Sequence, residues 1–387
     1  MPSSASAIGR GLLLPAAVVV VVLLLDAVAP AAGCYPRVFS FGDSLADTGN
    51  YPFVYGNDSG AAALLPPYAP TARPSSTAPP GAPPMDASWS TSSAALRGST
   101  DLRFGIRVVA ADTLGLPLGP LVRLYLSGRS AEDFACGANF AVGGATALSP
   151  DEIGARGFDN MGNQVGLDME MKWFRDLLDL LCPGNLAGCS DMMNQSLSWL
   201  EKSGAMTTTF LFFLEFPWRK FTPTPSVVAK ISSTISELIR LGAKNLVVPG
   251  NLPIGCVPDY LMIFKSDKEE DYEPQTGCLR WMNEFSQYHN KLLVEELKNL
   301  RKLHPGVTII YSDYYGAAME IFLSPEQYGI EHPLVACCGG EGPYGVSPTT
   351  KCGFGEYKLC DNPENTFLLA NRFRYPQTAT LVSAANI

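Results

Sequence analysis

Histidine is scarce in this sequence, with three among 387 residues. Imidazole is the most common general base in enzymes and one of the most common metal ligands. His289, His304 and His332 are therefore the whole supply for any mechanism that needs an imidazole, and a histidine-rich metal centre is excluded.

Basic residues are outnumbered, and charge is sparse overall. The chain has 28 Lys and Arg against 37 Asp and Glu, a formal net charge of −9, and only 17% of its residues are charged. Nucleic-acid binding needs a positive surface that neutralises phosphates, so no nucleic acid is expected as a partner. Apolar residues make up 47% of the chain, which is ample for a large core and excludes wholesale disorder.

Long hydrophobic runs are also missing, apart from one near the N-terminus. Arg10 precedes an apolar run at 12–25, and residues 27–31, Ala-Val-Ala-Pro-Ala, contain two overlapping A-x-A cleavage patterns. This predicts a secretory signal peptide over residues 1–31. An uncleaved signal anchor is the alternative, although the run is shorter than the roughly 20 residues that a spanning helix needs. We therefore expect a secreted protein, extracellular or in the cell wall, with no stable membrane span after cleavage.

Cysteine is plentiful by contrast, with ten residues. An even number in an oxidising compartment predicts several disulfides, although the sequence leaves their connectivity open. A zinc site would need cysteine and histidine at ligand spacing, and Cys337-Cys338 has no such neighbours, so no metal or cofactor is predicted. Three pairs close short loops and are the first expected disulfides: Cys182 with Cys189, Cys256 with Cys278, and Cys352 with Cys360.

Two Asn-x-Ser sequons, at Asn57 and Asn194, predict glycosylation of a secreted chain. Each fits a surface loop.

Short β-branched or aromatic runs alternate with longer helical patterns. This is typical of βαβ units around a mostly parallel sheet, and it continues without a linker to about residue 320, so we expect one α/β domain over 32–387. A Pro/Ala/Ser-rich stretch at about 69–100 is interpreted as an exposed insertion, and the tail from about residue 365 lacks a clear closing helix. The predicted strands are 38–41, 210–214, 245–248 and 307–311, and the predicted helices carry apolar residues at 228–239, before Gly242, and at 285–300.

The strongest local signal is the segment 39–50, Phe-Ser-Phe-Gly-Asp-Ser-Leu-Ala-Asp-Thr-Gly-Asn. A strand that runs into Gly-Asp-Ser places Ser44 at the carboxyl end of the first strand, where open α/β sheets bind ligands. Such a serine can be a nucleophile, and its own backbone N–H can help to hold an oxyanion. A polar turn with a helix-capping serine is the alternative explanation for Gly-Asp-Ser alone.

Further blocks accompany the serine segment, at 137–146 (Gly-Ala-Asn-Phe-Ala-Val-Gly-Gly-Ala-Thr), 246–256 (Leu-Val-Val-Pro-Gly-Asn-Leu-Pro-Ile-Gly-Cys), 276–278, 303–306, 311–315 and 337–340. With these blocks the chain resembles the plant GDSL esterase/lipase family of SGNH hydrolases over most of the mature sequence. The resemblance implies a secreted, three-layer αβα, flavodoxin-like domain that hydrolyses carboxylic esters. It also implies a Ser-His-Asp triad with three oxyanion donors: the serine N–H, a glycine N–H and an asparagine side chain.

Part of that machinery matches this chain residue by residue. Ser44 matches the nucleophile and one oxyanion N–H, and Gly144 matches the glycine donor, whose N–H can approach a substrate without a Cβ in the way. Asp43 and Asn139 match supporting positions, and Asn139 is interpreted as a residue that orients its loop. A packing turn is the alternative explanation for Gly144.

The other catalytic positions do not match. The family has Gly-Asn-Asp after a strand resembling 210–214, whereas this chain continues Glu215-Phe216-Pro217. The family also has Asp-x-x-His-Pro after a stretch like 360–363, whereas this chain has no histidine after His332.

The three histidines are poor substitutes for the missing base. His289 lies in an apolar helical pattern, which predicts a partly buried structural role, and His304 follows a helix end, where a cation suits the helix dipole. His332, in Glu331-His332-Pro333, is the remaining candidate base, although the family aligns it to non-catalytic sequence.

The sequence therefore predicts a secreted ester hydrolase with little activity, acting on a small-molecule or polymer-linked ester. The alternative is a catalytically inactive member that binds an ester or glycan in the same cleft. A third hypothesis is alternative splicing or an imperfect gene model, because the family pattern is lost abruptly at 69–100, after Glu215 and after Glu364. Sequencing the full-length transcript tests that hypothesis, and the same reading frame through residues 215 and 364 would contradict it.

Overall fold

The computed structural model describes residues 35–55, 122–155, 165–184, 186–201, 224–336, 338–347 and 357–359. Its strands are β1 (Val38–Gly42), β2 (Arg123–Leu124), β3 (Gly137–Asn139), β4 (Leu197–Glu201), β5 (Asn245–Pro249), β6 (Thr308–Ser312), β7 (Cys338–Gly339) and β8 (Lys358–Leu359). Its α-helices are α2 (Tyr51–Tyr55), α6 (Pro150–Gly154), α7 (Leu167–Leu181), α8 (Leu186–Asn194), α10 (Thr224–Arg240), α11 (Pro258–Ile263), α12 (Arg280–Leu303) and α13 (Tyr314–Leu323). Its 3₁₀ turns are η1 (Tyr125–Ser127), η2 (Glu132–Phe134), η3 (Ile254–Cys256), η4 (Glu269–Asp271) and η5 (Pro325–Tyr328).

The central sheet has the strand order β2-β3-β1-β4-β5-β6, and all of its described strand pairs are parallel. Later strands are added on both sides of β1, so the direction of winding reverses there. Open α/β sheets bind ligands beyond the carboxyl ends of the strands at such a reversal. The topology therefore points to the loops that follow β1 and its neighbours β3 and β4.

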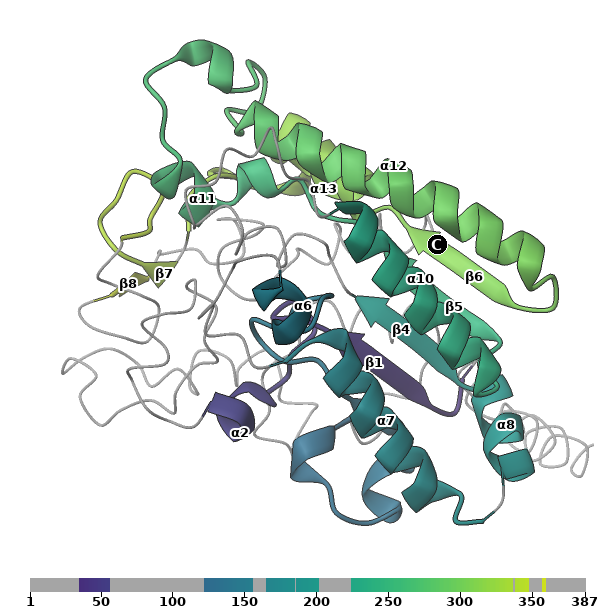
Figure 1. Cartoon of the computed structure of the whole chain (residues 1–387). Helices are drawn as coiled ribbons and strands as arrows, with labels where there is room; N and C mark the ends of the chain where they lie inside the picture. The colour runs from purple at the N-terminus through teal and green to yellow at the C-terminus, as the bar shows by residue number, and fades with distance from the viewer. Residues whose placement is uncertain are drawn as a thin grey trace, which may run out of the picture.

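Helices cover both faces of this sheet, which gives three layers (Figure 1). α7, α10 and α12 cross one face, where the core includes Phe39 and Phe41 of β1. α13 lies on the other face, where the core includes Trp199 and Val247. Successive side chains of a strand point to opposite faces, so alternate residues of one strand contribute to the two cores. The predicted three-layer α/β fold is confirmed.

The two helical patterns found in the sequence form α10 and α12, as predicted. α10 buries Val228, Ile231 and Ile235 against the sheet. It ends just before Gly242, which has a φ of +105° that other residues rarely adopt. The N–H of Ala243 then donates back to the carbonyl of Leu238 at 2.9 Å, so the glycine ends the helix as expected.

One strand of the sheet was not predicted from the sequence. The strand between β1 and β5 is β4, formed by Leu197–Glu201, whereas the predicted strand at 210–214 lies outside the described residues. The sequence Leu-Ser-Trp-Leu-Glu is less apolar than Phe-Leu-Phe-Phe-Leu, so composition gave no signal for β4, and the strand at 210–214 stays a prediction. The pairing places β4 between β1 and β5, because all five of its residues pair with β1 and its first three pair with β5.

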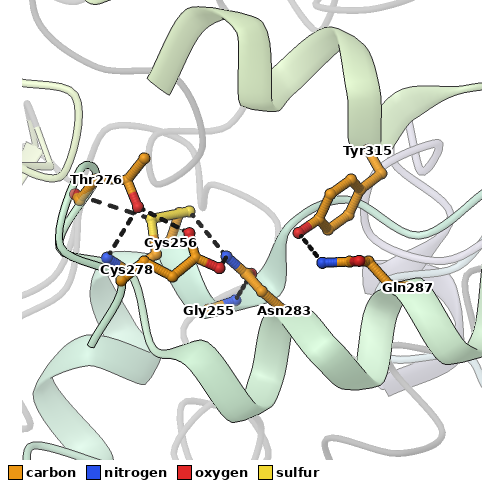
Figure 2. Close-up of a disulfide and its surroundings, with 8 residues drawn as sticks. Gly255, Cys256, Thr276, Cys278, Asn283, Gln287 and Tyr315 are labelled. Carbon is orange, nitrogen blue, oxygen red and sulfur yellow. Dashed lines mark hydrogen bonds between the residues drawn. A yellow bond between two sulfur atoms is a disulfide. The ribbon is translucent and has the colours of Figure 1, made fainter. Parts of the chain in front are cut away.

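Two of the three expected disulfides are confirmed. Cys182 is joined to Cys189 across the α7–α8 connection, and Cys256 is joined to Cys278 beside the start of α12 (Figure 2). Cys352 and Cys360 lie outside the described residues, so their pairing stays a prediction.

Other expectations also fall outside the described part of the chain. They are the leader at 1–31, the sequon at Asn57, the insertion at 69–100 and the tail from 365. Among the helices that the structure describes, none has the length and apolar character needed to cross a bilayer.

Candidate functional site

Ser44 lies in a tight turn, residues 43–47, which we call the serine turn. β1 ends at Gly42, and the N–H of Ala46 donates to the carbonyl of Asp43 at 3.1 Å. A Cβ on Gly42 would lie 2.8 Å from the Cβ of Ala46, so glycine is required for the chain to fold back. Asp43 is fully buried, whereas Ser44 is partly exposed. The turn thus presents the predicted nucleophile at the carboxyl edge of the sheet.

Gly144 lies in a second turn at the same edge, residues 142–145, which we call the glycine turn. The chain beyond β3 follows β1, and the N–H of Val142 donates to the carbonyl of Gly42 at 3.2 Å. Gly144 has a φ of +83°, which favours glycine there. Gly144 is buried, and its N–H has no acceptor among the described residues. The two predicted oxyanion residues therefore lie in adjacent turns that leave neighbouring strands.

Two buried asparagines link the chain segments that contain these turns. The side-chain amide of Asn139 donates to the carbonyl of Ala46 and the hydroxyl of Thr48, both at 2.8 Å. In return, the amide of Asn50 donates to the carbonyls of Asn139 and Ala141, at 2.8 and 3.0 Å. Each segment thus supplies one asparagine that binds the backbone of the other.

Asp47 is a site residue that the sequence reasoning missed. Its Oδ1 accepts the N–H groups of Gly49 and Asn50 at 2.6 and 2.7 Å, and its Oδ2 accepts those of Gly143 and Tyr51 at 2.7 and 3.1 Å. Burial raises the pKa of the Asp47 carboxyl, and the four N–H donors oppose that rise. The available signal was an aspartate two residues before Gly-Asn, a sequence typical of side-chain-capped turns.

Glu170 of α7 accepts a hydrogen bond from the last residue of β1, just before the serine turn. Its side chain is fully buried, and Oε2 accepts the N–H of Gly42 at 3.0 Å. A hydrogen bond from a backbone N–H to a carboxylate is stronger than one to a neutral acceptor. The end of β1 is therefore attached to a helix as well as to its neighbouring strands.

The histidines do not complete this site. His332 lies on an exposed turn after η5, and His304 lies at the end of α12. His289 is fully buried on α12, rather than partly buried as predicted, and burial lowers its pKa to about 4. Within the described residues, no histidine hydrogen-bonds to Ser44.

A further donor is expected after β4, because Glu201 of β4 pairs directly with Gly42. The segment that follows β4, residues 202–223, lies outside the described residues. Its sequence contains neither asparagine nor histidine. With β4 at Leu197–Glu201, the family's asparagine donor is expected within residues 202–223, and no asparagine is present there.

Two asparagines of α12 hold the loop 250–256, which follows β5. Oδ1 of Asn283 accepts the N–H of Gly255 at 2.9 Å, and Oδ1 of Asn290 accepts the N–H of Asn251 at 2.6 Å. Residues seven apart lie on one face of a helix, so both amides reach the same loop. α12 thereby fixes a third loop at the carboxyl edge of the sheet.

We expect Asn283→Ala to lower the free energy of unfolding by about 2 kcal/mol, because it leaves the buried N–H of Gly255 without an acceptor. Urea unfolding measures the change. Gln287→Ala is the matched control one turn later, since Gln287 is exposed and bonds only to the Tyr315 hydroxyl at 2.7 Å (Figure 2). Equal losses in the two variants would contradict the role given to Asn283.

No group of three or more His, Cys, Asp or Glu side chains that could hold a metal ion occurs within the described residues.

Comparison with known proteins bears on these turns. No family model matches the chain. It is 36% identical over 351 residues to GDSL esterase/lipase At1g28590 of Arabidopsis thaliana, covering 88% of this chain and 79% of that protein. The chain belongs to the GDSL esterase/lipase family. Sinapine esterase of Brassica napus, 34% identical over 336 residues, covers 86% of this chain and 80% of its own length.

Family membership confirms the resemblance drawn from the serine segment and its companion blocks. The GDSL esterase/lipases are hydrolases of ester bonds, and this chain is related to them over most of its length.

Proposed function

We propose that this GDSL protein is a secreted ester hydrolase in which Ser44 is the nucleophile and the N–H groups of Ser44 and Gly144 stabilise the oxyanion. The observation that carries the proposal is the pair of turns at the ends of β1 and β3, linked by Asn50 and Asn139. In the acylation step, the Ser44 oxygen bonds to the ester carbonyl carbon, its proton passes to a base, and the alcohol leaves with a proton.

We further propose that turnover is impaired, since no residue is assigned as the base. Removing the histidine of a serine-protease triad costs on the order of 10⁶ in kcat, and removing one oxyanion donor costs on the order of 10² to 10³. His332 is the remaining candidate base, although its exposed position gives it no structural link to Ser44. Water or buffer then has to accept the serine proton.

The substrate class that fits is a small-molecule or polymer-linked ester outside the cell. Support for secretion comes from the N-terminal leader pattern, from the two disulfides, and from the exposed sequon residue Asn194 at the end of α8. Asp43, fully buried behind Ser44, is proposed to support the serine turn.

We expect the purified protein to hydrolyse a short-chain nitrophenyl ester no faster than its Ser44→Ala variant. The reason is that a serine without a base is a weak nucleophile. Steady-state release of nitrophenol measures both rates after subtraction of buffer hydrolysis. Ser44-dependent turnover of ordinary enzymatic size would contradict the impairment, and His332→Ala would then test that histidine.

A second candidate function is ester or glycan binding without turnover. Two observations favour it. Hydrogen bonds hold both turns in place, and within the described residues no histidine bonds to Ser44. Calorimetric titration with a non-hydrolysable ester analogue tests it. Binding that Ser44→Ala leaves intact, in the absence of turnover, is the expected result for a binding protein.

A further inference from the structure

Asp47 is the one described side chain whose carboxylate joins the serine turn to the glycine turn. Three of its N–H donors, those of Gly49, Asn50 and Tyr51, come from its own segment. The fourth, from Gly143, comes from a residue 96 positions away and is bound at 2.7 Å. The local contacts fix the carboxylate, and the fixed carboxylate then fixes Gly143.

The chemistry of the contact requires a carboxylate. Both oxygens of Asp47 accept two N–H groups each. An asparagine offers one accepting oxygen, and its NH₂ group would face N–H donors on the other side. Asp47→Asn therefore loses one pair of bonds, either to Gly49 and Asn50 or to Tyr51 and Gly143.

The position of Gly143 matters because of its neighbour. The N–H of Gly143 is used by Asp47, whereas the N–H of Gly144 has no acceptor among the described residues. Only the two backbone dihedrals of Gly143 separate this N–H from that of Gly144, and the N–H of Ala145 closes the turn on the carbonyl of Val142 at 2.9 Å. Fixing Gly143 within this closed turn therefore limits the direction of the Gly144 N–H. A pre-oriented donor stabilises a developing oxyanion without reorganisation at the moment of reaction.

We propose that Asp47 is a positioning residue that holds the glycine turn against the serine turn and so aims the Gly144 N–H at the oxyanion formed on Ser44. This inference rests on the proposed function, which supplies the reacting serine. Asp47 itself does not touch the substrate.

The test compares Asp47→Asn with wild type and with Asp133→Asn. Asp133 is a partly exposed carboxylate whose Oδ2 accepts the N–H groups of Arg129 and Ser130 at 2.9 and 3.1 Å, so it undergoes the same chemical change away from both turns. The first readout is hydrogen–deuterium exchange of the peptide covering 140–147. We expect exchange to quicken by about tenfold or more in Asp47→Asn, and to stay at the wild-type rate in Asp133→Asn.

The second readout is labelling by an alkyl fluorophosphonate, in which an Oγ–P bond forms, the P–F bond breaks, fluoride leaves and the serine proton passes to water. Long incubations resolve slow labelling, and Ser44→Ala defines the background. We expect the maximal labelling rate of Asp47→Asn to fall by about 10- to 100-fold while the concentration for half-maximal rate stays unchanged. A purely structural role would lower thermal stability without this selective loss.

The outcomes separate the two hypotheses. Unchanged exchange at 140–147, or unchanged labelling of Asp47→Asn where wild type is labelled, overturns the role of Asp47. Labelling of wild type no faster than Ser44→Ala removes the proposed nucleophile, and the exchange result alone then decides whether Asp47 holds the glycine turn. If Asp47→Asn does not fold, Asp47→Glu takes its place. Its longer stem displaces the contact to Gly143, so the same two changes are expected, and their absence counts against the proposal.

Discussion

Gly137→Ala is expected to lower the free energy of unfolding by more than about 4 kcal/mol, which is a large part of the stability of an ordinary domain. Gly137 begins β3 opposite Val38 of β1, with a φ of +99°. A Cβ there would lie against the carbonyl oxygen of Val38 and 2.7 Å from the Val38 backbone nitrogen and carbonyl carbon. Backbone atoms in a central sheet cannot move aside as a flexible side chain can.

Two other glycines allow the steric clash of the new Cβ to be separated from the conformational cost of a positive φ. Gly306 and Gly329 both have open space where a Cβ would lie, and only Gly329 has a positive φ, of +67°. We expect almost no change for Gly306→Ala and about 1 kcal/mol for Gly329→Ala, which carries the conformational cost alone. Urea unfolding measures all three variants. A Gly137→Ala loss no larger than that of Gly329→Ala would show that β1 and β3 are not packed this closely.

His289 is expected to make the protein less stable in mild acid. Burial lowers its pKa to about 4 from an ordinary value of 6.5, so the unfolded chain binds a proton that the folded chain refuses. Stability from this group is complete above pH 6.5 and is lost as the pH falls towards 4. The loss amounts to about 3 kcal/mol. Unfolding by urea at several pH values between 7 and 4 measures it.

The variant His289→Leu removes the titrating group and is expected to flatten this part of the pH profile. Ser286→Ala is the matched control, because Ser286 is also fully buried on α12 and its hydroxyl, like both nitrogens of His289, has no partner among the described residues. It does not titrate between pH 4 and 7, so the wild-type slope should persist. The assignment fails if His289→Leu keeps the full wild-type slope.

Local sequence patterns predicted some strands of the sheet and missed others. The runs at 38–41, 245–248 and 307–311 were predicted within one residue of β1, β5 and β6, because each is a short apolar or β-branched run. β4 was missed, since Ser198 and Glu201 dilute its apolar character. Both residues are nevertheless buried: Ser198 pairs with β1 and β5, and Glu201 pairs with Gly42 of β1. Pairing on both sides overrides a modest propensity.

In the candidate site, too, local motifs identified some residues and missed those whose partners are distant in the sequence. Ser44 and Gly144 were identified from continuous blocks of sequence, and the structure places both in turns at the same edge of the sheet. Asp47 and Glu170 were not identified, although each binds backbone N–H groups of the site. Their partners lie 96 and 128 residues away along the chain, a separation that no local pattern encodes.

The sequence by itself determined the α/β class, two disulfide pairs, the serine and glycine motifs, and the shortage of histidine. These follow from residue types and short spacings, which act locally. Only the tertiary structure decided which segment pairs between β1 and β5, that His289 on α12 is fully buried, and that Asp47 joins two turns. These three features depend on strand pairing, on packing and on hydrogen bonds between segments that are distant in the sequence. Such segments come together only when the sheet has formed.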